Sequence, residues 1–208
     1  MPKYTLHYFA GNGRAAIARA ILTYVKADWT NNLINREEWP TIKTSGLCEF
    51  EQVPVLEVDG KKMCESNTIN LYLAETFNLL GKDSEENYQI YNLLMTNEDF
   101  TKPLYEFYLC KDESKKPELK QKVVEKLNFF LGKFEKRYIE LGKGKYFLGD
   151  KFTLADIYLA VALPSLIDIL GINDFQFESS PNVGTLVKRI KENELKEFYE
   201  KFFVKSNK

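Results

Sequence analysis

The hydrophobic pattern of the first part of the chain changes period twice. Residues 3–9 are rich in aromatic and β-branched side chains and end at a glycine-containing loop, which predicts a β-strand. From Arg14 to Val25 the apolar residues recur at helical spacing, which predicts an amphipathic helix with one buried face. A weaker strand pattern follows over residues 28–34. The chain is therefore expected to begin with a β-α-β unit.

A β-hairpin and a second helix are expected next. Residues 53–58 and 61–64 flank an Asp-Gly dipeptide, which supplies the positive φ angles of a type I′ turn. A helix is predicted from about Ser66 to Leu79. Residues 35–52, before the hairpin, have no sustained periodicity and are expected to be irregular.

Strand patterns largely vanish beyond the polar break at residues 80–83, and helical spacing takes over. Thr153 and Asp156 form a capping-box pattern in front of a strongly apolar stretch. The predicted helices are, in chain order, one capped by Ser84 and kinked or broken at Pro103, one over about 117–141, one over 157–170 and two short ones between 183 and about 203.

These elements indicate two domains. The 208 residues suffice for one large domain or two small ones, each with its own core. We predict a small α/β domain over residues 1–80 followed by an all-α domain over residues 84–208. Apolar residues make up 44% of the chain and charged residues 28%, which is typical of soluble globular proteins.

Charge and reactive residues exclude several classes of function. Twenty-nine basic residues against thirty acidic ones provide no attraction to a phosphate backbone, so nucleic acid is not an expected partner. His7 is the one histidine, which excludes sites that need two. The three cysteines are widely spaced with no Cys-x-x-Cys, which favours a reducing compartment. The N-terminus lacks the apolar core of a signal peptide, and we expect a cytoplasmic protein that does not enter the membrane.

A candidate ligand site follows from the residues that surround the hairpin. Ligands of open α/β sheets tend to lie at strand ends near helix N-termini. Pro54 stands immediately before a strand, where a cis Val53–Pro54 peptide explains it and turns the Val53 main chain outward toward an extended peptide ligand. Glu65 and Ser66 open the next helix, whose N–H groups suit a carboxylate. Taken alone, Ser66 is more simply an ordinary helix cap.

An ordered set of motifs resembles the cytosolic glutathione S-transferases, most of all the sigma class, which includes haematopoietic-type prostaglandin D synthases and cephalopod S-crystallins. The resemblance spans both domains. Its motifs are Lys3-Tyr4-Thr5-Leu6-His7-Tyr8-Phe9, Gly13-Arg14-Ala15, Trp39-Pro40, Lys43, Gln52-Val53-Pro54-Val55-Leu56, Glu65-Ser66-Asn67-Thr68-Ile69 and Thr153-Leu154-Ala155-Asp156.

The resemblance implies a thioredoxin-like domain that binds glutathione, an all-helical domain that shapes a pocket for a small hydrophobic electrophile, and a homodimer. It assigns Tyr8 as the catalytic residue, whose hydroxyl donates a hydrogen bond to the glutathione sulfur. Beside Tyr8, the glutathione-binding residues that it implies are Arg14, Trp39, Lys43, Gln52, Val53, Pro54, Glu65, Ser66 and, across the dimer, Asp99. The implied pocket residues are Phe9, Arg14, Tyr105, Tyr108 and Tyr158.

Three positions refine what the resemblance implies. Glu65 stands where many members have Gln, and its carboxylate suits the ammonium group of glutathione instead. Phe50 occupies the place of an aromatic key that inserts into the partner subunit. Met95 replaces one of the acids that form a magnesium site in the vertebrate prostaglandin synthases, so no metal is expected.

Two classes of function therefore compete. The first is an enzyme that uses the glutathione thiolate to attack hydrophobic electrophiles or to isomerise a prostaglandin-type peroxide. The second is a non-catalytic crystallin-like or glutathione-carrier protein. Crystallin-like members often carry a long insertion in the helical domain, and its absence here favours the enzyme. An adapter that binds no glutathione would require the whole motif set to be coincidental.

Overall fold

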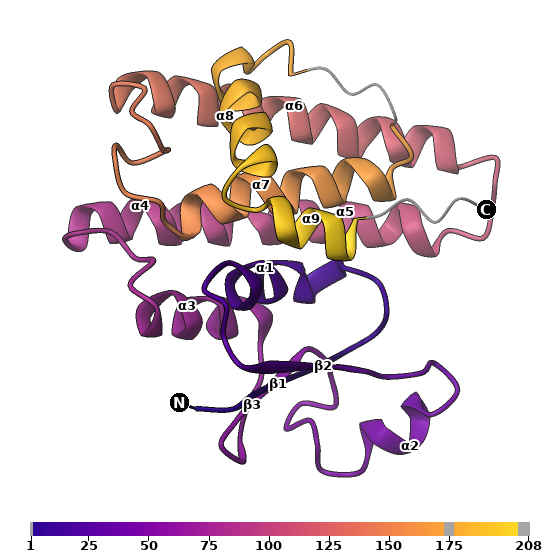
Figure 1. Ribbon diagram of the computed structural model, residues 1–208. Helices are drawn as coiled ribbons and strands as arrows, with labels where there is room; N and C mark the ends of the chain where they lie inside the picture. The colour runs from indigo at the N-terminus through magenta and orange to yellow at the C-terminus, as the bar shows by residue number, and fades with distance from the viewer. Residues whose placement is uncertain (1, 173–176, 204–208) are drawn as a thin grey trace. The chain divides into compact units, whose positions relative to one another are not determined.

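A computed structural model describes residues 2–172 and 177–203 of the chain. Its contacts divide it into two compact units, one formed by residues 1–79 with 192–208 and the other by residues 80–191. The first unit carries the β-sheet, and the second is built mainly from helices (Figure 1). The predicted α/β and all-α parts are therefore both present. One boundary differs, because residues 192–203 group with the first unit and not with the helical one.

The first unit contains a mixed sheet in the order β2-β1-β3-β4. The first two strands pair in parallel, and the third is antiparallel to both of its neighbours. The strands are β1 (Tyr4–Tyr8), β2 (Trp29–Leu33), β3 (Val55–Val58) and β4 (Lys61–Met63). The turn between the last two has φ angles of 48° at Asp59 and 83° at Gly60, as the type I′ prediction requires. The sheet is thioredoxin-like.

Helices flank this sheet within the same unit. They are the short 3-10 turn η1 (Gly13–Ala15), α1 (Ala16–Tyr24), α2 (Trp39–Lys43), α3 (Ser66–Thr76) and α9 (Lys196–Phe202). Helices α1 and α3 lie on one face of the sheet (Figure 1). The five-residue α2 was expected to be irregular, because so short a helix shows no hydrophobic period.

The C-terminal helix joins this unit through aromatic contacts. Helix α9 packs against α1. The Phe202 ring lies 6.1 Å from the Trp29 ring, and the Asn12 side-chain amide donates to the Phe202 carbonyl at 3.0 Å. These contacts are the physical reason why the end of the chain groups with its beginning.

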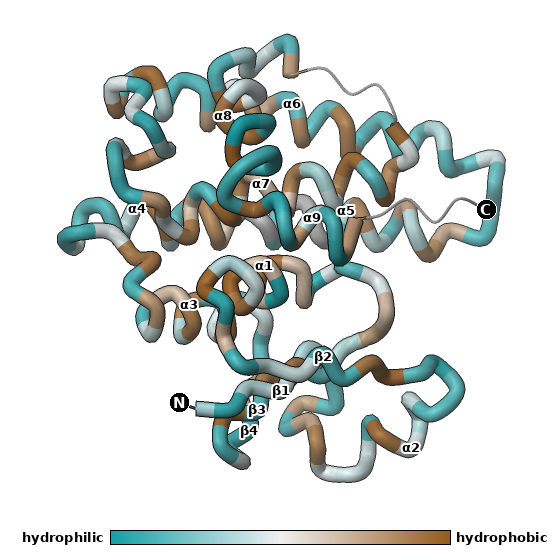
Figure 2. Tube along the Cα trace, viewed as in Figure 1, coloured by the Kyte–Doolittle hydropathy of each residue, from teal (hydrophilic) through white to brown (hydrophobic). Residues whose placement is uncertain are grey.

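The second unit comprises α4 (Ser84–Met95), α5 (Asn97–Leu109), α6 (Lys116–Glu140), α7 (Leu154–Ile169) and α8 (Pro181–Glu192). Figure 2 shows strongly hydrophobic segments along α7. Most residues of α7 are buried, so this helix forms the core of the unit. Among the residues that the structure describes, none of the helices has the length and hydrophobicity of a membrane-spanning segment.

Two details of α4 and α5 differ from the prediction. The N-cap of α4 is Asp83, whose carboxylate accepts from the Glu86 N–H at 2.9 Å, while Ser84 is the first helical residue. The break falls at Thr96, and Pro103 lies inside α5. A proline lacks the N–H of one helical hydrogen bond, and α5 nevertheless continues past it to Leu109.

The predicted capping box of α7 is present and buried. The Asp156 carboxylate accepts from the Phe147 N–H at 2.8 Å, from the Thr153 N–H at 2.9 Å and from the Thr153 hydroxyl at 3.0 Å. Burial raises the pKa of Asp156 to about 6, and these donors oppose that shift. The carboxyl is therefore ionised at neutral pH, and it joins the start of α7 to the loop that contains Phe147.

Candidate active site

Tyr8 ends β1 and is 9% exposed. Its hydroxyl oxygen accepts a hydrogen bond from the Arg14 backbone N–H at 3.1 Å. A Cβ atom on Gly13 would lie 2.6 Å from this oxygen, and Gly13 has a φ of +39°. Glycine is therefore needed there, because it lets η1 approach the tyrosine and aim the N–H at its oxygen. This bond uses the hydroxyl as an acceptor, and its hydrogen is the atom that would donate to a sulfur.

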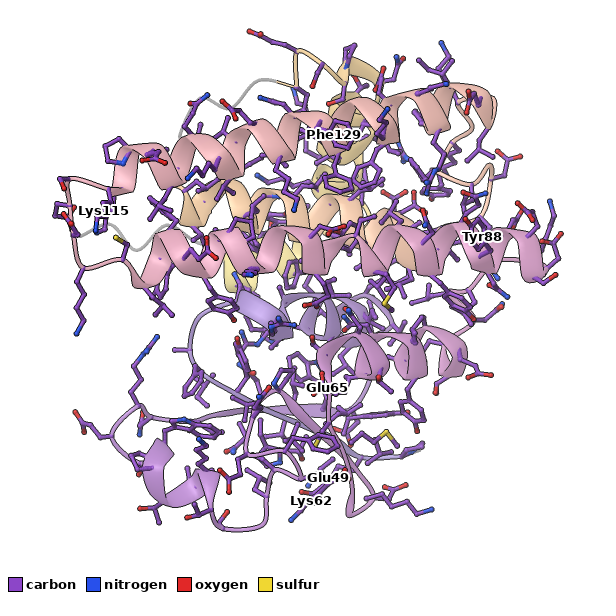
Figure 3. All side chains as sticks on the ribbon, turned by 180° about the vertical axis from the view of Figure 1, so that it is seen from behind. Glu49, Lys62, Glu65, Tyr88, Lys115 and Phe129 are labelled. Carbon is purple, nitrogen blue, oxygen red and sulfur yellow. The ribbon has the colours of Figure 1, made fainter. Side chains whose placement is uncertain are left out.

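The start of α3 lies next to Arg14, the residue whose N–H contacts Tyr8. The Arg14 guanidinium lies 3.5 Å from the Ser66 hydroxyl, measured between Nη1 and Oγ. Ser66 is buried and is the first residue of α3, so the free N–H groups of this helix lie beside it. Glu65, labelled in Figure 3 just before the helix, has a φ of +67°. Such backbone is costly for a residue other than glycine, and it is concentrated at functional sites.

Aromatic contacts link Tyr8 to α2. The Phe9 ring lies 5.5 Å from the Tyr8 ring and 5.5 Å from the Trp39 ring. The Arg36 guanidinium lies 5.5 Å from the centroid of the Phe9 ring. The structure thus brings Trp39 into the neighbourhood of Tyr8 and adds Arg36, which sequence analysis missed. The only feature of the sequence that could have indicated Arg36 is the place of this cation three residues before Trp39.

The segment before β3 has main-chain groups that are available to pair with an extended ligand. The Val53–Pro54 peptide is cis, as predicted from the position of the proline. Among the described residues, the Val53 main chain forms no hydrogen bond. The Lys43 ammonium lies 3.6 Å from the Glu51 carboxylate in a pair whose side chains are both substantially exposed. Exposed pairs of this kind are weak, so Lys43 can exchange Glu51 for a ligand carboxylate at little cost.

Beneath Tyr8 lies a buried charge that sequence analysis did not select. Arg19, on α1, is 0% exposed. Burial lowers the pKa of its guanidinium, and the neighbouring Tyr8 raises it. The sequence could have indicated this burial, because Arg19 lies three and four residues from other buried positions and therefore on the apolar face of α1.

The second unit holds the remaining predicted residues. Tyr105 and Tyr108, on α5, are 42% and 57% exposed, and Asp99 on the same helix is also exposed. Tyr158, on α7, is 1% exposed, and burial raises its pKa. The structure places Tyr158 in the core, because its side chain is almost completely buried. The assignment of these side chains to an electrophile pocket stays a prediction.

Known protein families match both parts of the chain. The N-terminal domain model of the glutathione S-transferases matches residues 4–75, and their C-terminal domain model matches residues 98–202. A glutathione S-transferase of Anopheles gambiae is 33% identical over 195 residues, which is 93% of each chain.

Solved structures agree with these matches. Prostaglandin synthase D of Nilaparvata lugens is 30% identical with a TM-score of 0.81, over 96% of this chain and 98% of that one. The sigma-class glutathione S-transferase of Fasciola hepatica is 25% identical with a TM-score of 0.82, over 97% of each chain.

Proposed function

The chain belongs to the glutathione S-transferase family, and from that premise we propose that Tyr8 activates the thiol of bound glutathione for attack on a hydrophobic electrophile. The observation that carries this proposal is the hydrogen bond from the Arg14 N–H to the Tyr8 hydroxyl at 3.1 Å. It orients the tyrosine at the end of β1, beside the start of α3 and the Phe9 ring.

The chemistry follows from thiol acidity. A thiol with a pKa near 8.5 is mostly protonated at neutral pH, and the thiolate is the nucleophile. A hydrogen bond from the Tyr8 hydroxyl stabilises the thiolate, and lowering the thiol pKa by about two units corresponds to about 2.7 kcal/mol. The thiol proton passes to solvent. The sulfur then forms a bond to the electrophilic carbon, and the leaving group departs with its electron pair.

The rest of the peptide is held by groups of complementary charge. We assign the glycyl carboxylate to Lys43 and Trp39, and the central cysteinyl residue to the main chain of Val53 between Gln52 and Pro54. The γ-glutamyl carboxylate is assigned to Ser66 and the N-terminus of α3, where an anion is favoured. Its ammonium group is assigned to Glu65 and to Asp99 of a second copy of this chain. No step requires a metal.

The electrophile is assigned to the half-buried Phe9 and the exposed Tyr105 and Tyr108, together with Arg14. A second candidate reaction is isomerisation of a prostaglandin-type peroxide, and it is favoured by the likeness to the Nilaparvata lugens synthase. A cytoplasmic location belongs to the proposal, because all three cysteines are free and thiols persist in reducing compartments.

The proposal is tested by binding to immobilised glutathione and by conjugation assays with an aryl halide, an α,β-unsaturated aldehyde and a prostaglandin endoperoxide. Turnover with at least one of them supports an enzyme and identifies the substrate class. Binding without turnover of any of them favours the crystallin-like or carrier function instead. Absence of binding contradicts both.

Lys43→Ala and Ser66→Ala are expected to raise the KM for glutathione about tenfold and to change kcat less than about threefold. Each variant removes one hydrogen bond to a charged group that is remote from the sulfur, so the loss falls on binding. Steady-state kinetics at varied glutathione measures both constants. Lys61→Ala, on exposed β4, is the control and should behave as wild type. A fall in kcat with an unchanged KM would contradict the placement.

We further propose that the active unit is a two-fold homodimer. Phe50 is 55% exposed, and α4 presents Tyr88, Tyr91 and Met95 at 56%, 39% and 47% exposure on neighbouring turns. An exposed apolar stripe of this kind is typical of an interface. A two-fold axis would give two equivalent sites, each receiving Asp99 from the other copy.

Phe50→Ala is expected to weaken dimerisation by about 2 kcal/mol, because a buried aromatic anchor contributes about that much to an interface. Glutathione affinity should fall with it on dilution, since each monomer loses the opposing Asp99. Analytical ultracentrifugation over a concentration series measures the effect. Phe129→Ala is the control, because this ring is 59% exposed on α6, outside the proposed interface (Figure 3). A wild-type monomer at micromolar concentration with full glutathione affinity would exclude the dimer.

A further inference from the structure

Arg19 is a buried cation whose described hydrogen bonds all go to neutral oxygens. Its Nε donates to the Asn31 side-chain oxygen at 3.1 Å. Its two terminal nitrogens donate to the Gly11 carbonyl at 2.7 Å and to the Phe9 carbonyl at 2.9 Å. Among the described residues no carboxylate pairs with it. A fully buried charge without a counter-ion is costly, so its position requires an explanation.

Two of these bonds hold the loop that builds the active site. Phe9 and Gly11 lie between the end of β1 and the start of η1, and this loop leads to the Gly13 and Arg14 backbone that contacts the Tyr8 hydroxyl. The third bond ties the same guanidinium to β2 through Asn31. A planar group with five donors in a rigid fork is suited to fixing several acceptors at once, whereas a lysine ammonium is not.

The Arg19 guanidinium also lies against the ring of Tyr8. Its central carbon is 5.7 Å from the centroid of Tyr8 and 5.6 Å from that of Phe202 on α9. These separations fall within the range of cation–π attraction. Because Arg19 is buried, its field is screened less by salt than that of a surface cation.

We propose that Arg19 is a positioning residue for thiol activation, which holds the loop after β1 and places a positive charge behind Tyr8 that favours the glutathione thiolate. This inference rests on the proposed role of Tyr8. A positive charge on one side of the tyrosine ring stabilises negative charge that develops at its hydroxyl end. The mutual influence of Tyr8 and Arg19 appears in the Arg19 pKa, which burial lowers and Tyr8 raises.

The surrounding charged and titratable groups are few. Tyr8 lies on β1 and Arg14 on η1. Lys201, on α9, has its ammonium 5.6 Å from the centroid of the same Phe202 ring. The two other cations share the sign of Arg19 and do not neutralise it. A new carboxylate beside Arg19 would therefore be the first group to cancel its field.

Asn31→Asp places that carboxylate in position with little change of shape. The Arg19 Nε keeps an oxygen acceptor, so the loop stays held while the positive charge is paired. We expect the acidic limb of the pH dependence of kcat/KM to move upward by about half a pH unit or more. At pH 6.5 this corresponds to a kcat/KM about twofold below wild type, rising to about threefold at lower pH, and the two curves converge near pH 8.5. Ultraviolet absorbance of the bound thiolate, titrated against pH, should show the same shift.

Asn32→Asp is the matched control. It makes the same charge change one residue along β2, where the side chain points to the opposite face of the sheet. Its pH profile should remain within about 0.2 unit of wild type. If Arg19 only held the loop in place, the pH dependence of kcat/KM in Asn31→Asp would also match wild type, because the hydrogen bond to Arg19 Nε survives.

Arg19→Lys keeps the positive charge but removes the planar guanidinium with its several donors, so it tests the hydrogen-bonding geometry separately from the charge. We expect kcat to fall at least about fivefold, the KM for glutathione to stay within a few-fold and the acidic limb to stay near its wild-type position. A wild-type pH profile for Asn31→Asp, or, if that variant does not fold, a wild-type kcat for Arg19→Lys, would overturn the inference. If Tyr8→Phe retains full turnover, the proposed function of Tyr8 fails instead, and this separates the two failures.

Discussion

Tyr8→Phe is expected to lower the turnover of glutathione conjugation at least tenfold while glutathione affinity stays within a few-fold of wild type. The change removes one hydroxyl and keeps the ring, so the contact with Phe9 and the packing at the end of β1 remain. The lost hydrogen bond acts on the sulfur, where negative charge develops, and so the effect falls on the rate and not on binding.

The same variant should also change the pH dependence. Without the hydroxyl, the acidic limb of kcat/KM should move upward by about two units, toward the pKa of a free thiol. Tyr4→Phe is the matched control, because Tyr4 is also buried and lies at the opposite end of the same strand. Wild-type turnover in Tyr8→Phe would mean that another group donates the hydrogen bond to the glutathione sulfur, and Arg14 would be the first to be tested.

Asp156→Asn is expected to lower the free energy of unfolding by about 3 kcal/mol. The carboxylate accepts from three donors in a fully buried place. Asparagine has one acceptor oxygen, and its NH₂ group must face a donor of Thr153 or Phe147. Each buried donor left without an acceptor costs about 1–3 kcal/mol.

Urea unfolding at neutral pH measures this loss. Asp150→Asn, at an exposed position nearby, should stay within about 0.5 kcal/mol of wild type. At a temperature where Asp156→Asn is folded, its kcat per folded molecule should match wild type, since the carboxylate supports the start of α7 and not the chemistry. A loss below about 1 kcal/mol would show that another group satisfies these donors.

Local chemistry made much of the site predictable. The Asp-Gly dipeptide at 59–60 requires positive φ angles, and the structure has them. The cis Val53–Pro54 peptide was expected because a proline without an N–H stood directly before a strand. The capping box at Thr153 was expected because its two partners are three residues apart.

Features without a local signal were missed or misplaced. Helix α2 is too short for a hydrophobic period, and the cap of α4 moved from Ser84 to Asp83 because both residue types cap helices well. The deep burial of Tyr158 on α7 also had no local signal, and its assignment to the electrophile pocket stays a prediction.

The amino-acid sequence by itself determined most of the elements, the hairpin turn, the capping box and the family resemblance, because each depends on residues a few positions apart or on the order of short motifs. Only the tertiary structure decided that α9 packs on α1, and that Arg19 lies beneath Tyr8 with its hydrogen bonds to Asn31, Gly11 and Phe9. Hydrophobic periodicity shows that a helix has a buried face. It does not show which distant strand and loop that face will meet, because the partner of a buried charge is set by long-range packing.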